Sequence, residues 1–120
     1  MAATSPRTEQ ALGALRTLRS ILAECTDVAE RRMFGHRAFF VKGRMFACLY
    51  GRGLALKVPA RRRAALLLQK HCRPFRPHGK RMAQWVEIRR GRGVDFRNDV
   101  ESIVAAMRFV RRQGTLEARR

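Results

Sequence analysis

The chain has 120 residues, of which 46% are apolar, and it contains no apolar run long enough to cross a membrane, so one domain with a single core is expected. Its 27 lysines and arginines against 9 acidic residues leave a formal net charge of +18, which attracts polyanions such as nucleic acid or anionic membrane surfaces. Because 23 of these cations are arginines, a GC-rich genome is an equally good explanation of the charge, and both stay open.

The first predicted element is a helix from Ser5-Pro6 to about Cys25. Serine suits the cap before a helix, and proline suits its first turn. Apolar residues recur at helical spacing and form a stripe that would pack on the domain: Leu12, Leu15, Leu18, Ile21, Leu22 and Cys25. The arginines of this segment also fit a mitochondrial transit peptide, but Glu9 and Glu24 favour the packed helix. Residues 1–5 are expected to be flexible.

Residues 32–58 predict three short strands, because aromatic and apolar runs alternate with glycine turns. The strands are expected at residues 38–41, 45–50 and 54–58. Lys42-Gly43 has its glycine second, as in a tight hairpin, and places a lysine where the backbone needs a positive φ. Connections as short as this one and Gly51-Arg52-Gly53 make the strands antiparallel, so the segment is a meander.

Pro59 ends the sheet and starts a predicted helix over residues 60–72. Its apolar face would consist of four residues, Ala64, Leu67, Leu68 and Cys72. Three arginines fall in its first turn: Arg61, Arg62 and Arg63. Cations there oppose the helix dipole, which is a mild hint of an anionic partner, although solvated arginines are the simpler explanation.

The rest of the chain predicts a loop, a strand and a last helix. Prolines and a glycine make residues 73–81 irregular, and residues 82–88 form a strand in which Trp85 is a core side chain rather than a stacking surface for nucleic acid. Asn98 and Glu101 fit a capping box, and Gly114 fits the end of that helix. The buried stripe would be Val100, Ile103, Val104, Met107 and Val110, and residues 115–120 are expected to be flexible.

These elements predict an α+β fold, in which helices pack on an antiparallel sheet in the order α-β-β-β-α-β(-β)-α. One domain is expected over residues 1–120, with an ordered core at about 8–113.

The residues that could carry chemistry do not form a recognisable set. Cys25, Cys48 and Cys72 are widely spaced, odd in number and set among apolar residues, so buried reduced thiols in the cytoplasm are expected. His71-Cys72 with His78 looks loosely like a metal site, but adjacent helix residues point apart and no fourth ligand is evident. No nucleophile, base and orienting group can be named together, so we expect no enzyme, metal or cofactor.

Several spaced motifs follow one another in the order of a known family. They are Arg32-Met33-Phe34-Gly35, Phe39 and Phe40, Gly43-x-Met45-Phe46-Ala47, Leu56-Lys57-Val58, and Pro74-Phe75-x-Pro77-x-Gly79-x-x-Met82-x-x-Trp85-Val86. This order resembles the N-terminal domain of TfoX/Sxy proteins over about residues 30–112. The motif positions expected to be structural are Met33, Phe34, Gly35, Gly43, Met45, Phe46, Lys57, Met82 and Trp85.

The resemblance implies a sandwich of helices on an antiparallel sheet, with an extra short strand near residues 74–78, and a non-enzymatic role. TfoX/Sxy proteins are regulators of natural competence that work at promoters with an activator of the cyclic-AMP receptor type. They carry a second, C-terminal helical domain, for which 120 residues leave no room, so a small stand-alone member is expected. The implied partner is a protein such as a transcription regulator.

Two functions therefore remain open. The leading one is an adaptor that binds a protein partner, and the alternative is direct, low-specificity binding of nucleic acid. The arginines expected to make that alternative contact are Arg61, Arg62, Arg63, Arg89, Arg90, Arg92, Arg111 and Arg112. An exposed sheet edge would also allow two copies to pair as a homodimer. Four residues, Met33, Phe34, Met45 and Phe46, are expected to pack in the core rather than line a ligand pocket.

Overall fold

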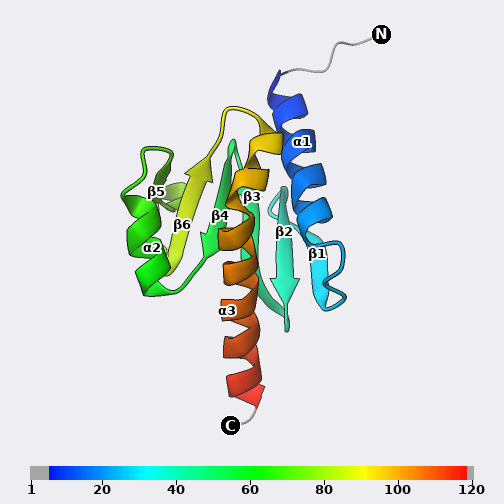
Figure 1. Ribbon diagram of the computed structural model, residues 1–120, viewed down its shortest axis with the longest axis vertical. Coiled ribbons are helices and arrows are strands. Elements are labelled where there is room, and N and C mark those ends of the chain that lie inside the picture. The colour runs from blue at the N-terminus through cyan, green and yellow to red at the C-terminus, as the bar shows by residue number, and fades with distance from the viewer. Residues whose placement is uncertain (1–5, 119–120) are drawn as a thin grey trace.

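The computed structural model describes residues 6–118, and the side chains of residues 10–117. Within that part of the chain, three α-helices accompany a six-stranded antiparallel sheet (Figure 1). The elements are α1 Pro6–Ile21, β1 Val28–Met33, β2 His36–Val41, β3 Arg44–Tyr50, β4 Gly53–Lys57, α2 Ala60–Leu67, β5 Cys72–Pro74, the 3₁₀ turn η1 Pro77–Gly79, β6 Trp85–Arg89, the 3₁₀ helix η2 Gly93–Asp99 and α3 Val100–Ala118. The predicted α+β class is confirmed, and the order of elements broadly matches.

The strands lie in the order β1-β2-β3-β4-β6-β5. The meander has four strands rather than the three predicted, because β1 pairs with β2 from Val28 opposite Val41 to Met33 opposite His36. The strand β1 has the sequence VAERRM and lies at the edge of the sheet with most of its residues exposed. Apolar alternation could not mark such a strand, because neither of its faces is fully buried.

The three α-helices of residues 6–118 lie on one face of the sheet. In Figure 1, α1 and α3 lie in front of the strands, and α2 lies beside β5 and β6. The buried helix side chains Leu18, Leu22, Leu66, Ile103, Met107 and Val110 join one core with the sheet side chains Phe39, Phe46, Leu54, Leu56, Val86 and Ile88. This core confirms much of the predicted packing, including the burial of Phe46.

A β-bulge in β3 decides which of its side chains face the helices. Phe39 pairs with Ala47 and Phe40 pairs with Met45, so Phe46 is an extra residue on β3. Phe46 and Ala47 consequently both pack in the core under the helices, whereas Met45 packs on the opposite face.

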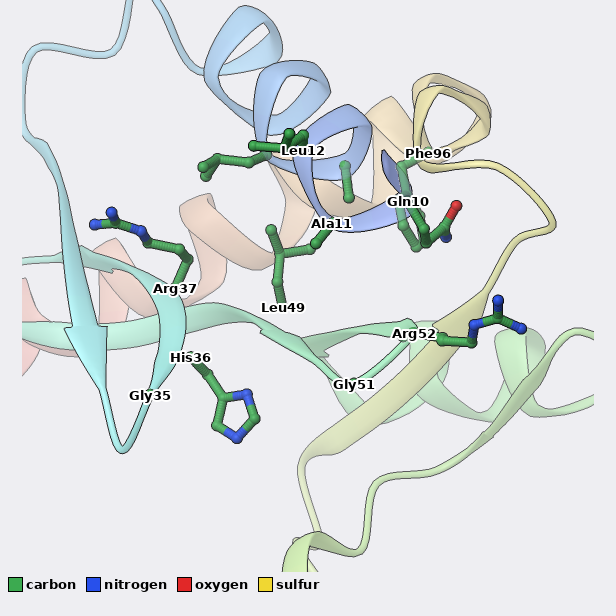
Figure 2. A pocket seen from close by; sticks show the side chains of 13 residues that line it. Gln10, Ala11, Leu12, Gly35, His36, Arg37, Leu49, Gly51, Arg52 and Phe96 are labelled. Carbon is green, nitrogen blue, oxygen red and sulfur yellow. The ribbon is translucent and has the colours of Figure 1, made fainter. Parts of the chain in front are cut away.

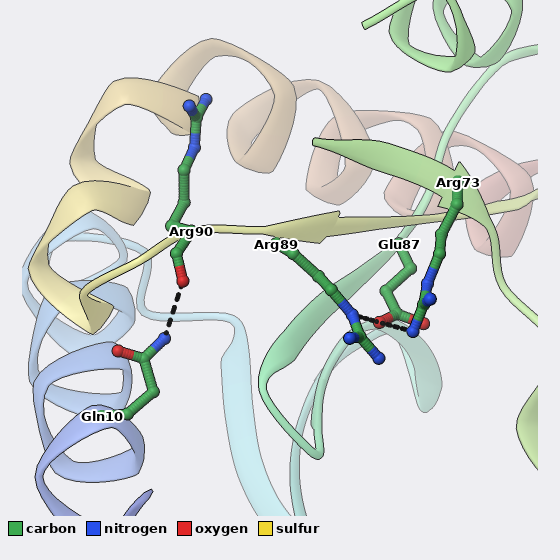
Figure 3. A network of polar contacts seen from close by, with 5 residues as sticks. All are labelled: Gln10, Arg73, Glu87, Arg89 and Arg90. Carbon is green, nitrogen blue, oxygen red and sulfur yellow. Dashed lines mark hydrogen bonds and ion pairs between the residues drawn. The ribbon is translucent and has the colours of Figure 1, made fainter. Parts of the chain in front are cut away.

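Two glycines allow α1 and η2 to lie backbone against backbone. A Cβ on Gly93 would collide with the backbone of Gln10, Gly13 and Ala14, and a Cβ on Gly13 would touch the backbone of Gly93 and Val94. The Gln10 amide also donates to the carbonyl of Arg90, over 3.3 Å (Figure 3). The glycine inside α1 is therefore explained by this close approach.

The helix predicted at residues 60–72 is shorter than expected. It ends at Leu67, because the chain must turn before Cys72–Pro74 pairs with Ile88–Val86. Leu66 is the buried residue of α2. The predicted apolar face is wrong at Ala64 and Leu68, which are exposed, but Leu67 packs against the core and Cys72 is buried in it. The extra strand lies at residues 72–74, slightly before the expected 74–78.

The last helix is longer than expected and starts differently. The backbone at Asn98 is already helical, because η2 leads directly into α3, so the predicted cap at this residue is wrong. Val100 is 41% exposed rather than part of the buried stripe. The helix continues through Gly114 to Ala118, which corrects both the predicted end and the flexibility expected of residues 115–118.

Gly114 reflects packing rather than helix termination, since a Cβ there would lie 2.6 Å from the Cβ of Lys42 in the β2–β3 turn. The flexibility predicted for residues 1–5 and 119–120 falls outside the described residues. Among residues 6–118, no helix combines the length and the apolar composition that crossing a bilayer requires.

Candidate functional site

The sheet face opposite the helices, which we call the distal face, carries a second apolar cluster. Its buried members are Ala38, Phe40, Cys48, Ala55, Phe75 and Trp85, with Met45, Tyr50 and Met82 partly buried beside them. The segment between β5 and β6 folds over part of this face. Phe75 packs there against Trp85 and Tyr50, with ring centroids 5.8 and 5.3 Å apart. Within residues 6–118, no α-helix contributes to this cluster.

A pocket of about 430 Å³ opens on the distal face. Its apolar lining consists of Met33, Phe34, Met45, Cys48, Phe75, Pro77 and Met82. Unbranched methionine side chains adapt to different shapes, so a pocket with three of them can accept more than one apolar group. The expectation of core packing is therefore wrong for Met33 and Phe34 and is confirmed for Phe46. Met45 both packs against the apolar cluster of the distal face and lines the pocket.

Phe34 is the most exposed large apolar side chain among the described residues, with 92% of its surface accessible. It precedes Gly35 in the two-residue turn between β1 and β2, where φ is +50° at Phe34 and +81° at Gly35. A positive φ costs a bulky residue about 1–2 kcal/mol, and an exposed ring gains almost no burial in return. Folding alone therefore does not explain a phenylalanine at this position.

The polar groups of the pocket are His36, Tyr50, His78 and Lys80. The Tyr50 ring lies between the two imidazoles, with centroids 4.7 Å from His36 and 6.4 Å from His78. His78 also has a positive φ, +54°, in η1. Among the described residues no carboxylate lines the pocket, so its polar lining is neutral or positively charged.

Beside the pocket, a second hollow of about 380 Å³ is lined by Tyr50 and by three arginines around a carboxylate. Glu87 is 4% exposed, and its Oε2 accepts hydrogen bonds from Arg89 Nε at 2.8 Å and from Arg73 Nη2 at 3.3 Å (Figure 3). Burial raises the pKa of Glu87, and the charge of Arg73 offsets part of that effect. The Glu87 side chain fills the space over Gly53 in which a Cβ would stand.

A smaller hollow of about 290 Å³ lies on the other side of the sheet, between α1 and the turns at Gly35 and Gly51 (Figure 2). Leu12, Leu49 and Phe96 contribute apolar surface to it. Figure 2 shows the His36 ring pointing away from Leu12 and Leu49, which agrees with its place in the distal pocket.

Most of the eight arginines predicted to bind nucleic acid have partners within the protein. Arg63 donates to the carbonyl of Trp85 at 2.9 Å, which ties α2 to β6. The ion pairs are Arg89 with Glu87, Arg90 with Asp99, Arg92 with Asp95 and Arg111 with Asp27. Asp99, directly before the last helix, is therefore the ion-pair partner of Arg90.

Arg62 lies with Arg90 in a hollow of about 360 Å³ that Asp99 also lines. Arg62 and Arg112 lie together in another space. They line a groove of about 550 Å³ between α2 and α3, with Arg108 beside them. Arg62 donates to Ser102 Oγ at 3.3 Å, and Glu101 lies in the same groove. Arg61 is exposed and has no polar partner among residues 10–117. The role of these arginines in binding nucleic acid stays a prediction.

Several of the other motif positions contribute to turns, to packing or to the end of a strand. Gly35 and Gly43 have positive φ angles in turns, and Trp85 is 6% exposed under Phe75. Lys57 ends β4, where burial, and to a smaller extent the charge of Arg44, lower its pKa.

The sheet separates Cys72 from His78, whereas Cys48 lines the distal pocket together with His36 and His78. Cys72 packs in the core under the helices, whereas His78 lies in the distal pocket. Burial raises the pKa of Cys48 to about 11, so its thiol is protonated at neutral pH. Within the described residues, no three His, Cys, Asp or Glu side chains come together as metal ligands would.

Most of the polar residues of the distal face were not predicted from the sequence to form a site: His36, Tyr50, Arg73, Arg76, His78, Lys80 and Glu87. One available signal was the Phe34-Gly35 pair, because phenylalanine suits the first position of such a turn poorly. Another was Tyr50, which follows Cys48 at the two-residue spacing of one strand face.

Comparison with known proteins places the chain in a family. The TfoX N-terminal domain family matches residues 20–104, which are more than half of the chain and include all six strands. No curated protein and no solved structure matches the chain. The match agrees with the resemblance carried by the motifs, and the chain belongs to the TfoX N-terminal domain family.

Proposed function

We propose that this chain is a non-enzymatic regulatory module that binds a protein partner through the distal face of its sheet. Membership of the TfoX N-terminal domain family supports a regulatory role. The observation that carries the choice of surface is Phe34, a 92% exposed ring at the rim of an apolar pocket, in a backbone conformation that suits it poorly. Aromatic side chains contribute strongly to protein interfaces once a partner covers them.

The composition of the distal face fits the same proposal. Apolar patches with polar rims commonly mark protein-binding surfaces. Here an apolar pocket lies next to His36, His78 and Lys80. A transcription regulator is the partner class to test first, because the motifs resemble those of regulators that act with an activator at promoters.

Quantitative capture from an extract of the host cell tests this proposal with three baits, the unaltered chain, Phe34→Asn and Lys42→Asn. Both substitutions replace a positive-φ residue before a glycine, but Lys42 lies at the opposite end of β2 from Phe34. We expect a partner whose affinity, measured after purification, falls about tenfold or more with Phe34→Asn alone. Equal affinity for all three baits would contradict the proposed surface.

We propose low-specificity binding of nucleic acid as a second candidate function. The observation that favours it is the groove between α2 and α3, in which Arg62, Arg108 and Arg112 gather. Such a groove could follow a phosphate backbone, although Glu101 within it offsets one of the charges.

A salt titration of duplex and single-stranded DNA binding tests the second candidate. Each phosphate contact contributes about 0.9 to the slope of log affinity against log salt for duplex DNA. Replacing Arg62, Arg108 and Arg112 with glutamine should lower the slope by about 2–3, whereas the same change at Arg16, Arg32 and Arg52 should leave it nearly unchanged. No binding at low salt, or equal losses in both variants, would reject this groove.

A further inference from the structure

We propose that the distal face recognises an acidic peptide segment in which an apolar side chain stands next to a carboxylate. The apolar side chain would enter the pocket at Phe34, and the carboxylate would lie on the arginines around Glu87. This inference rests on the proposed function, because it names the chemistry of the partner that the distal face would bind.

The apolar half of the site has the size and flexibility of a side-chain pocket. Its volume of about 430 Å³ is enough for one large apolar side chain with part of the adjoining backbone. Met33, Met45 and Met82 can adjust to the shape of that side chain. Phe34 stands at the rim, where it would cover the bound group and lose its own exposure to water.

The cationic half of the site is held in place by Glu87. Arg73 and Arg89 are about half exposed, with side-chain exposures of 51% and 48%, and each donates to the nearly buried carboxylate. A guanidinium has five N–H donors, so both retain free donors that can face a ligand. Arg76 lines the same hollow and is exposed, and its guanidinium has no hydrogen-bond or ion-pair partner among residues 10–117.

The charges of this hollow are unequal. Three arginines and one carboxylate line it, so the hollow keeps an excess of positive charge even when Glu87 is ionised. Guanidinium groups bind carboxylates with two parallel hydrogen bonds, which orients the ligand as well as attracting it. A carboxylate is therefore the group that this hollow complements.

The two halves adjoin, because Tyr50 lines both the pocket and the hollow. One short extended segment can consequently place an apolar side chain in the first and an acidic side chain in the second. Among the described residues, no carboxylate other than Glu87 lines either space. A basic or purely apolar segment would leave the arginines without a partner.

A peptide fits this face better than single-stranded nucleic acid does. Sequence-tolerant binding of bases needs exposed aromatic rings on which successive bases stack. Phe75 and Trp85 are 3% and 6% exposed, so neither offers a free ring face. Phe34 is the exposed phenylalanine of the distal face, and it stands beside a concave, methionine-lined pocket rather than in a row of rings.

Selection from a random peptide library displayed on phage tests the inference. The bait is the full chain at about 0.3 M salt, where long-range attraction to its net charge is screened. Peptides that also bind Phe34→Asn are removed. We expect the remaining peptides to share an apolar residue and an aspartate or glutamate at a fixed spacing. Replacing that acid with its amide should weaken binding to the unaltered chain about tenfold.

Charge reversal at the hollow provides the matched control. Arg76→Glu should weaken the selected peptide about tenfold or more and should abolish the preference for the acid over the amide. Arg16→Glu changes the net charge equally on an exposed position of α1, and should have little effect. Equal weakening by both variants would indicate general charge attraction and overturn the inference.

The failure of this inference can be told apart from the failure of the proposed function. Peptides that depend on Phe34 but share no acid would overturn the acidic partner and leave the distal face as a protein-binding surface. The absence of any Phe34-dependent peptide would count against both. Displacement of a selected peptide by single-stranded DNA, with DNA binding itself lost in Phe34→Asn, would assign the face to nucleic acid instead.

Discussion

Phe34 and Lys42 occupy equivalent positions in two hairpin turns of the same sheet. Each precedes a glycine, and their φ angles are +50° and +54°. Asparagine tolerates this conformation better than either residue, because its short polar side chain can hydrogen-bond locally. Replacing each residue with asparagine therefore shows whether the phenylalanine at position 34 is needed for folding or for binding.

We expect Phe34→Asn and Lys42→Asn each to raise the free energy of unfolding by about 0.5–1 kcal/mol. Urea denaturation of both variants measures this. A loss of stability in Phe34→Asn would mean that the exposed ring supports the fold, and would remove the argument that it is retained for binding.

Asp27 provides a residue-scale prediction for pH. It lies just before β1, and it accepts two hydrogen bonds from Arg111 of α3, at 2.7 and 2.8 Å. Arg111 lowers the pKa of Asp27 below its unfolded value of about 3.9. The contribution to stability is therefore fully present well above pH 4 and is lost as the pH falls through the lower, folded pKa.

Because this ion pair is partly exposed, Asp27→Asn should cost only about 0.5–1 kcal/mol at pH 7. The cost should shrink as the pH is lowered from about 5 towards 2, since both proteins then lack the charge. Unfolding measured at a series of pH values tests this. A cost that does not change with pH would show that the pair contributes through packing alone.

At the scale of elements, the crossing of α1 over η2 depends on Gly93. An alanine there would push its Cβ into the backbone of Ala14 and Gln10, which cannot move without displacing α1. We expect Gly93→Ala to lower the free energy of unfolding by about 2–3 kcal/mol. Gly91→Ala is the matched control, because a Cβ at Gly91 meets nothing within 4 Å and should change stability little. Similar effects of both changes would contradict this account of the crossing.

The elements that could be predicted from the sequence are those with a strong local pattern. Aromatic and apolar runs between glycine turns identified β2, β3 and β4, and helical spacing identified all three α-helices. The polar edge strand β1, the early end of α2 and the passage of α3 through Gly114 depend on pairing and contacts between segments far apart in the sequence. Local patterns contain no information about such contacts.

At the scale of the whole molecule, the net charge of +18 predicted cationic surfaces but not their distribution. Arginines paired with carboxylates, such as Arg90 with Asp99 and Arg111 with Asp27, could not be distinguished by sequence from those that remain free. The distal face was missed for a similar reason, because Phe34, Tyr50 and Arg76 are brought together only by the fold of the sheet and the β5–β6 segment.

Site-specific photo-cross-linking in living host cells tests the distal face most directly. A photoreactive phenylalanine analogue would replace Phe34 in one variant and Leu68 in another, because both side chains are about 90% exposed but Leu68 lies directly after the last residue of α2. We expect one discrete protein to be cross-linked at position 34 and not at position 68. No cross-link at position 34, or the same products at both positions, would contradict the assignment of the distal face as the partner-binding surface.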